Sequence, residues 1–254
     1  CACSPEFGAP ALLDRFERLQ PIVLLIRLST HYGGRTFSHD EKLPLIKQRL
    51  PCLKRIILWD LSHTTSSLPH DDLYRDWSIF VNQYPPLQVF TAFPFSHPLY
   101  ILFSSGTTGK PKCMLHGAGN VLIQHIKEIG LHADLSEQDN LFFYTTCGWM
   151  MWNWMVSGLA LGMTLTLYDG APLFSTPDHL FSIIEREKVT AFGTSASYLK
   201  ALEKTHALPR KRYDLSSLHL ILSTGSPLLP YQYDYVYQAI HPTVRLNSIS
   251  GGTD

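Results

Sequence analysis

Residues 164–204 read TLTLYDGAPLFSTPDHLFSIIEREKVTAFGTSASYLKALEK. Two short apolar runs, at 164–168 and 189–193, are each followed by the apolar periodicity of a helix, at 177–187 and 195–204. Thr176, before Pro177, and Ser195 stand where helix-capping hydroxyls are expected. Because strands that alternate with helices build a parallel sheet covered by helices, this stretch predicts an α/β fold.

The same alternation extends along the chain in both directions. Further strands are expected at 22–28, 55–59, 100–104, 141–144, 218–223 and 243–249. Further helices are expected near 11–19, 40–49, 117–129, 149–161 and 230–240. We find no repeat, low-complexity tract or internal domain boundary, so the whole chain is expected to form α/β structure with mostly parallel sheets.

The composition restricts the class of protein. The 254 residues are 45% hydrophobic and 17% charged, which suits a globular domain with a substantial core. Lys plus Arg and Asp plus Glu both number 21, so no net charge favours nucleic acid or an anionic membrane surface. The five cysteines include no CxxC and follow no signal peptide, which favours free thiols and a cytoplasmic location.

The apolar run 149–168 admits two interpretations. Its length approaches the roughly 20 residues that a membrane-spanning helix needs, and Gly158 and Gly162 have GxxxG spacing. Its second half, MTLTLYDG, is rich in β-branched residues and leucine and ends in Asp169-Gly170, which suits a buried strand and a turn. We therefore expect a helix followed by a core strand, and no membrane span.

The segment SSGTTGKPK, residues 104–112, carries the strongest chemical signal and follows the expected strand YILFS. It combines flexible glycines, hydroxyl donors and lysines, all of which suit a polyphosphate: Gly106, Gly109, Ser104, Ser105, Thr107, Thr108, Lys110 and Lys112. It is not a Walker P-loop, because Pro111 follows Lys110 where a hydroxyl residue would be needed. The alternative is an ordinary polar surface turn.

SSGTTGKPK is similar to the phosphate loop of the acyl-adenylate-forming, or AMP-binding, superfamily. Three further segments match that superfamily in order: GWMMWNW (148–154), STGSPL (223–228) and SISGGTD (248–254). Within it, TTCGWMMWNWMVSGLA, CSPEFG and LDRFERLQP resemble the acetoacetyl-CoA synthetases. The resemblance covers essentially the whole chain, is weakest from about residue 25 to residue 90, and implies part of the large N-terminal domain of an adenylate-forming enzyme.

The resemblance implies that residues 104–112 hold the β and γ phosphates of ATP. Lys112 would stabilise the pyrophosphate that leaves when a substrate carboxylate attacks the α-phosphorus. Gly225, Ser226 and Pro227 would pack against the adenine ring, although a simple turn after a strand explains the same residues.

The resemblance also gives roles to the last matched segment. Ser250, Gly251, Gly252 and Thr253 would lie beneath the adenylate, with the Thr253 hydroxyl on the α-phosphate. Asp254 occupies the position of an acidic residue that helps to hold Mg²⁺, usually a glutamate in the family.

Trp149 stands where related short-chain synthetases close the acyl pocket with a tryptophan, which would limit substrate length. Trp152 and Trp154 are expected to be core residues. Cys147 is expected to be a buried, inert thiol. His116 either touches pyrophosphate or is a loop histidine with its hydrogen bonds satisfied.

The implied activity is ligation of acetoacetate to CoA with consumption of ATP, with ATP, Mg²⁺ and CoA as cofactors or co-substrates, feeding lipid synthesis. By the same resemblance, residues 1–254 are expected to be a partial adenylation domain, incomplete at both ends and without the small C-terminal domain that carries a catalytic lysine. Two alternatives stay open. One is a catalytically inactive protein that binds a nucleotide or a partner, and the other is a synthetase for a related short carboxylate such as acetate or propionate.

Overall fold

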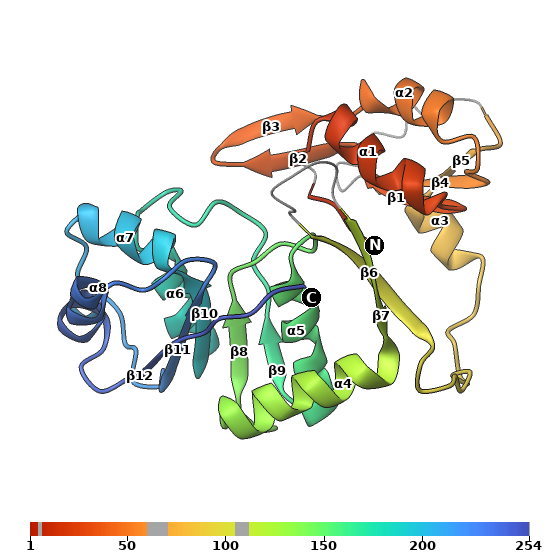
Figure 1. The fold of residues 1–254 in the computed structure, drawn as a ribbon. Coiled ribbons are helices and arrows are strands. Elements are labelled where there is room, and N and C mark those ends of the chain that lie inside the picture. The colour runs from red at the N-terminus through yellow and green to blue at the C-terminus, as the bar shows by residue number, and fades with distance from the viewer. Residues whose placement is uncertain (5–6, 60–70, 105–111, 254) are drawn as a thin grey trace. The chain divides into compact units, whose positions relative to one another are not determined.

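The computed structural model describes residues 1–4, 7–59, 71–104 and 112–253 (Figure 1). They belong to two compact units. The larger unit comprises Cys1–Ala2, Phe95–Leu102 and Met114–Asp254, and the smaller comprises Cys3–Pro94 and Phe103–Cys113. The assignment of residues 1–254 to one partial adenylation domain stays a prediction, since two compact units can belong to one domain.

A five-stranded sheet organises the larger unit, with strand order β12-β11-β10-β8-β9. Its strands pair in parallel throughout, as the alternation of strands and helices predicts. Phe192 in the central strand lies opposite Phe142 on one side and Ile221 on the other. The strands are β8 (Asn140–Phe143), β9 (Thr164–Thr166), β10 (Ala191–Ser195), β11 (Leu220–Thr224) and β12 (Arg245–Ser248).

Helices cover both faces of this sheet, so its strands are apolar on both sides. Helices α6, α7 and α8 gather beside β10, β11 and β12 (Figure 1), and their apolar residues form one core cluster with Phe142, Phe192 and Ile221. Trp154 and Met155 of α5 pack in another cluster with Leu141. The helices are α4 (Ala118–Ile126), α5 (Met150–Val156), α6 (His179–Glu187), α7 (Ala196–Lys204) and α8 (Pro230–Tyr235).

Three of these helices change their hydrogen-bonding pattern before they end. A π-helical turn, Lys127–His132, continues α4, and another, Val236–Ile240, continues α8. A 3₁₀ turn, Ser157–Leu161, continues α5, and a separate 3₁₀ turn covers Pro209–Lys211. Because π-helical turns are rare and often accompany functional sites, the turn after α4 bears on where a ligand could bind.

One of the two predicted helix caps is confirmed. The Ser195 hydroxyl accepts a hydrogen bond from the Tyr198 N–H at 3.1 Å at the start of α7. The prediction for Thr176 is wrong, because α6 begins at His179 with Asp178 as its N-cap residue and no side-chain cap. The buried Asp178 carboxylate instead accepts two hydrogen bonds from Arg212.

The apolar run 149–168 forms α5, the 3₁₀ turn and β9, which agrees with a helix followed by a core strand. Among the described residues, no helix has the length and apolar character needed to cross a membrane.

The smaller unit contains a parallel three-stranded sheet and an antiparallel hairpin. The sheet has the order β1-β4-β5, with β1 (Val23–Arg27), β4 (Arg55–Trp59) and β5 (Tyr74–Asp76). The hairpin joins β2 (Ser29–Tyr32) to β3 (Arg35–Ser38). The helices are α1 (Ala9–Leu19), α2 (Lys42–Arg49) and α3 (Trp77–Asn82). The hairpin, β5 and α3 are additions to the predicted elements.

Strands β6 (Pro98–Ser104) and β7 (Lys112–Gly117) pair as a separate two-stranded sheet, in which β7 is also an unpredicted element. None of the five cysteines forms a disulfide, as expected. The prediction of a buried Cys147 is wrong, because this residue is exposed.

Candidate functional site

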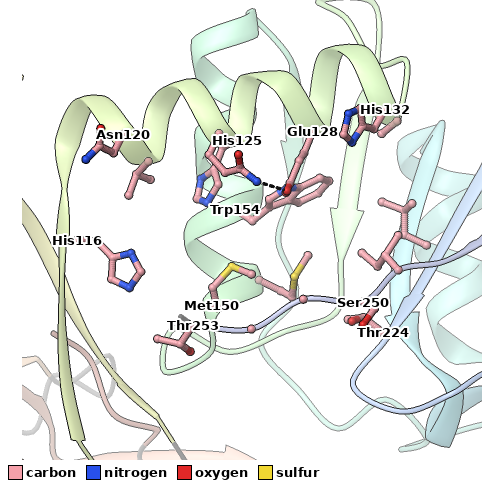
Figure 2. Close-up of a pocket in the computed structure, with 18 of the residues that line it drawn as sticks. His116, Asn120, His125, Glu128, His132, Met150, Trp154, Thr224, Ser250 and Thr253 are labelled. Carbon is pink, nitrogen blue, oxygen red and sulfur yellow. Dashed lines mark hydrogen bonds between the residues drawn. The ribbon is translucent and has the colours of Figure 1, made fainter.

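A pocket of about 750 Å³ lies within the larger unit. Its walls come from α4 with the following π-helical turn, from α5, and from β6 and β7. Its floor comes from the ends of β11 and β12 and the residues after β12 (Figure 2). The carboxyl ends of parallel strands are where ligands usually bind in α/β proteins, so this pocket is the candidate active site.

The floor includes the predicted segment Ser250, Gly251, Gly252 and Thr253. Thr224, the last residue of β11, lines the same region. Adjacent parallel strands β11 and β12 therefore deliver these two segments, distant in sequence, to one edge of the sheet. The hydroxyls of Thr224, Ser250 and Thr253 give this edge hydrogen-bonding groups suited to a phosphate or carboxylate.

The wall formed by α4 and its π-helical turn is called the roof below. It presents polar side chains that were not predicted from the sequence. Glu128 accepts hydrogen bonds from the Trp154 indole nitrogen at 3.1 Å and from the Gln124 amide nitrogen at 2.5 Å. The bond from Trp154 joins α5 to the π-helical turn after α4, whereas the bond from Gln124 lies within α4 and that turn. Asn120, Gln124 and Glu128 recur every fourth residue, and this spacing in the predicted helix 117–129 was the available signal.

His116 lies in β7 and lines the pocket. The prediction that it is a loop histidine with satisfied hydrogen bonds is therefore wrong. Its ring packs against Tyr100 of β6, with 5.2 Å between ring centroids. Its Nε2 is shielded from solvent and has no hydrogen-bond partner within the part of the chain that the structure describes.

His125 lines the roof beside Glu128 and is buried. Its Nδ1 lies 2.8 Å from the Ser157 hydroxyl, which donates to the Asn153 carbonyl at 3.2 Å. Because that hydroxyl proton is used, His125 Nδ1 carries the proton and donates. Burial lowers the pKa of His125, and the nearby Glu128 carboxylate partly opposes this effect.

We expect acidification to destabilise the fold in part through His125. Its folded pKa lies below its usual value of about 6.5, so only the unfolded chain takes up the proton as the pH falls past that value. The loss is at most about 1.4 kcal/mol per pH unit. Urea unfolding at pH 7.5 and 5.5 should therefore show a smaller difference for His125→Gln than for the wild type.

The exposed residue His31 provides the matched control, and His31→Gln should keep the wild-type pH dependence. An equal pH dependence in the wild type and His125→Gln would contradict the assignment of acid sensitivity to His125.

The structure describes only some of the other residues predicted to bind the phosphates and the adenine ring. Ser104 ends β6 and Lys112 begins β7 with an exposed side chain. Gly225 adopts a left-handed backbone with φ +83°, and Ser226 and Pro227 are exposed beside it, outside the pocket lining. The loop positions Ser105, Gly106, Thr107, Thr108, Gly109 and Lys110 lie outside the described residues.

The acyl-wall and metal assignments stay predictions. Trp149 is the N-cap residue of α5, is 68% exposed and lies outside the pocket lining, whereas Trp154 of the same helix lines it. Trp152 is partly buried and Trp154 is buried, as predicted for core residues. The Mg²⁺ position, Asp254, lies outside the described residues, among which no three His, Cys, Asp or Glu side chains form a group that could hold a metal ion.

Comparison with known proteins gives consistent matches. Residues 1–245 match the AMP-binding enzyme family. Acetoacetyl-CoA synthetase from Mus musculus is 46% identical, over 99% of this chain and 38% of that protein. Acetoacetyl-coenzyme A synthetase from Rhizobium meliloti (strain 1021) is 45% identical, over 100% of this chain and 39% of that protein. Malonamoyl-CoA synthetase from Penicillium aethiopicum is 39% identical, over 100% and 38%.

The structure agrees with these sequence matches. The solved structure of acetoacetyl-CoA synthetase from Streptomyces lividans superimposes with a TM-score of 0.92 at 39% identity. The match covers all of this chain and 39% of that one. The chain therefore spans less than two-fifths of the length of these relatives.

Proposed function

This chain belongs to the AMP-binding enzyme family, and from that premise we propose that it is part of an acetoacetate–CoA ligase. The ligase would convert acetoacetate and ATP to acetoacetyl-AMP and pyrophosphate, and would then transfer the acetoacetyl group to the thiol of CoA with release of AMP. Curated relatives that carry the acetoacetyl-CoA synthetase name are 43% to 47% identical over nearly the whole chain, which supports this choice of carboxylate.

The pocket is the observation that carries the proposal. Its volume of about 750 Å³ falls in the usual range for small-ligand sites, roughly 300–1,000 Å³. This is more than acetoacetate alone needs and suits an acyl adenylate. The pocket floor also contains Thr253, the residue that the family resemblance assigns to the α-phosphate.

Residues of this chain would act in the first step of the reaction, the formation of acetoacetyl-AMP. A carboxylate oxygen of acetoacetate attacks the α-phosphorus, and the bond from that phosphorus to the pyrophosphate oxygen breaks. The Thr253 hydroxyl would donate to an α-phosphate oxygen, and Lys112 would stabilise the charge that gathers on the departing pyrophosphate. Mg²⁺, when bound, would neutralise phosphate charge, with Asp254 as its proposed ligand.

ATP–pyrophosphate exchange tests the proposal. The assay is run with acetoacetate, butyrate, propionate and acetate, on this chain and on the protein encoded by the complete gene. We expect the protein from the complete gene to exchange most rapidly with acetoacetate. Exchange with acetate or propionate in preference to acetoacetate would indicate a related short-chain synthetase.

Absence of exchange with every acid would contradict the ligase proposal. In that case, calorimetric binding of ATP to the same protein would distinguish an inactive nucleotide-binding protein from one that has lost the nucleotide site.

A further inference from the structure

We propose that Glu128 selects the substrate by charge: it admits 3-oxo acids whose far end is neutral and rejects dicarboxylates of the same shape. This inference rests on the proposed function and adds a specificity-determining residue to it. The charge of Glu128, the bonds that hold its carboxylate and its place beside the apolar side of the pocket each contribute to the argument.

The first observation is the charge of the pocket lining. Among the described residues of that lining, Glu128 is the one Asp, Glu, Lys or Arg side chain, and it is only partly buried. The neighbouring His125 adds no positive charge at neutral pH, because burial lowers its pKa. An acid that enters this part of the pocket therefore meets a negative charge.

The second observation is that two neutral donors hold the carboxylate in place. The Trp154 indole nitrogen lies 3.1 Å from one oxygen of Glu128, and the Gln124 amide nitrogen lies 2.5 Å from the other. Figure 2 shows the Glu128 side chain reaching from the roof to the Trp154 indole. Lys127 holds the Gln124 amide oxygen at 3.0 Å and lies outside the pocket lining. The carboxylate therefore keeps its charge and has little freedom to turn away from a ligand.

The third observation is the place where a bound acyl group would lie. Met150, Met151 and Trp154 of α5 supply the apolar side of the pocket, and Trp154 carries the bond to Glu128. The Thr253 hydroxyl belongs to the floor, where the α-phosphate would bind under the proposed function. An acyl group joined to a phosphate on the floor would therefore extend along α5 toward Glu128.

The consequence for substrate choice is clearest in three acids that share one skeleton. Acetoacetate, malonamate and malonate differ in one substituent of the 3-carbonyl carbon, which is a methyl group, an amino group or a charged oxygen. The methyl group is neutral, and the amino group can donate to the Glu128 carboxylate. The charged oxygen would be placed against a like charge, which is an effective means of rejecting a wrong ligand.

The test compares malonamate with malonate in ATP–pyrophosphate exchange by the protein encoded by the complete gene, at pH 8, where malonate is doubly ionised. The ratio of the two kcat/KM values is measured, because it cancels a general loss of activity. We expect the wild type to prefer malonamate. Glu128→Gln keeps the shape of the side chain and removes its charge, so it should lower the malonamate-to-malonate ratio by about tenfold or more. Glu128→Met should also lower the ratio, and it replaces Glu128→Gln if that variant does not fold.

Glu137 provides the matched control. It is exposed on the larger unit and lies outside the pocket lining. Glu137→Gln removes the same charge from the protein and should keep the wild-type ratio. An equal change of the ratio in Glu137→Gln and Glu128→Gln would overturn the inference, because the effect would then come from net charge.

Equal use of both acids by the wild type, or a preference for malonate, would overturn the inference. An unchanged ratio in a folded Glu128 variant would overturn it as well. Loss of exchange with every acid in a folded Glu128→Gln protein would do the same, because the residue would then serve the reaction itself. If the wild type exchanges with acetoacetate, each of these results leaves the proposed function intact. Absence of exchange by the wild type with every acid would overturn the proposed function and this inference together.

Discussion

Replacing Lys112 by alanine is expected to lower the rate of ATP–pyrophosphate exchange with acetoacetate by about a hundredfold or more. Negative charge gathers on the leaving pyrophosphate in the transition state, and a lysine ammonium group directed at it is most valuable there. Lys112 begins β7 with an exposed side chain, so its removal costs little packing. The change should therefore reduce kcat and kcat/KM together, measured from initial exchange rates in the protein encoded by the complete gene.

A lysine remote from the pocket provides the control. Lys200 is exposed on α7, and Lys200→Ala should exchange at the wild-type rate. Both variants should unfold at the wild-type temperature, which separates a catalytic defect from a folding defect. Wild-type exchange by a folded Lys112→Ala protein would contradict the role assigned to Lys112.

The buried strands could be predicted well because burial on both faces leaves a plain apolar run. The strand expected at 55–59 is observed as β4, Arg55–Trp59, and the run expected at 22–28 contains β1. The β2–β3 hairpin escaped detection because its strands are largely exposed and polar. Gly33 and Gly34 have φ of 57° and 76°, and a glycine pair of this kind between two short segments was the available signal.

The positions of helices could be predicted, but their changes in hydrogen bonding could not. An apolar stripe along a helix shows which face is buried. It does not distinguish an α-helical turn from a π-helical or 3₁₀ turn, because the same side chains face the core in each. The expected helix 117–129 therefore gave no sign of the π-helical turn Lys127–His132, which carries Glu128 to the pocket.

The candidate site, like the fold, could be predicted only in part from the sequence. The floor segment 250–253 was predicted from its motif, and the structure brings it to the pocket with Thr224. The roof and the His116 wall depend on strand pairing and helix packing between residues that are far apart in sequence. An unsatisfied nitrogen such as His116 Nε2 is a property of three-dimensional surroundings and has no signature in a single sequence.

Replacing Gly193 by alanine is expected to destabilise the larger unit by about 3 kcal/mol, because the added methyl group has no space. A Cβ at this position would lie 1.9 Å from Cδ2 of the Phe143 ring. Strand β10 cannot easily shift to relieve the contact, since it is paired with β8 on one side and β11 on the other. Urea unfolding should show a lower midpoint with little change in slope.

The same substitution is expected to disturb the pocket wall through one side chain, that of Phe143. Phe143 packs edge-on against Trp154, which lines the pocket and donates to Glu128. Phe143→Leu in the Gly193→Ala background should therefore restore part of the stability by freeing space. Gly130→Ala is the matched control, because its Cβ would lie 3.7 Å from Leu161 in ordinary contact, and it should be neutral or stabilising. Wild-type stability of Gly193→Ala would mean that Phe143 can move away without cost, and the link from sheet to pocket wall would then fail.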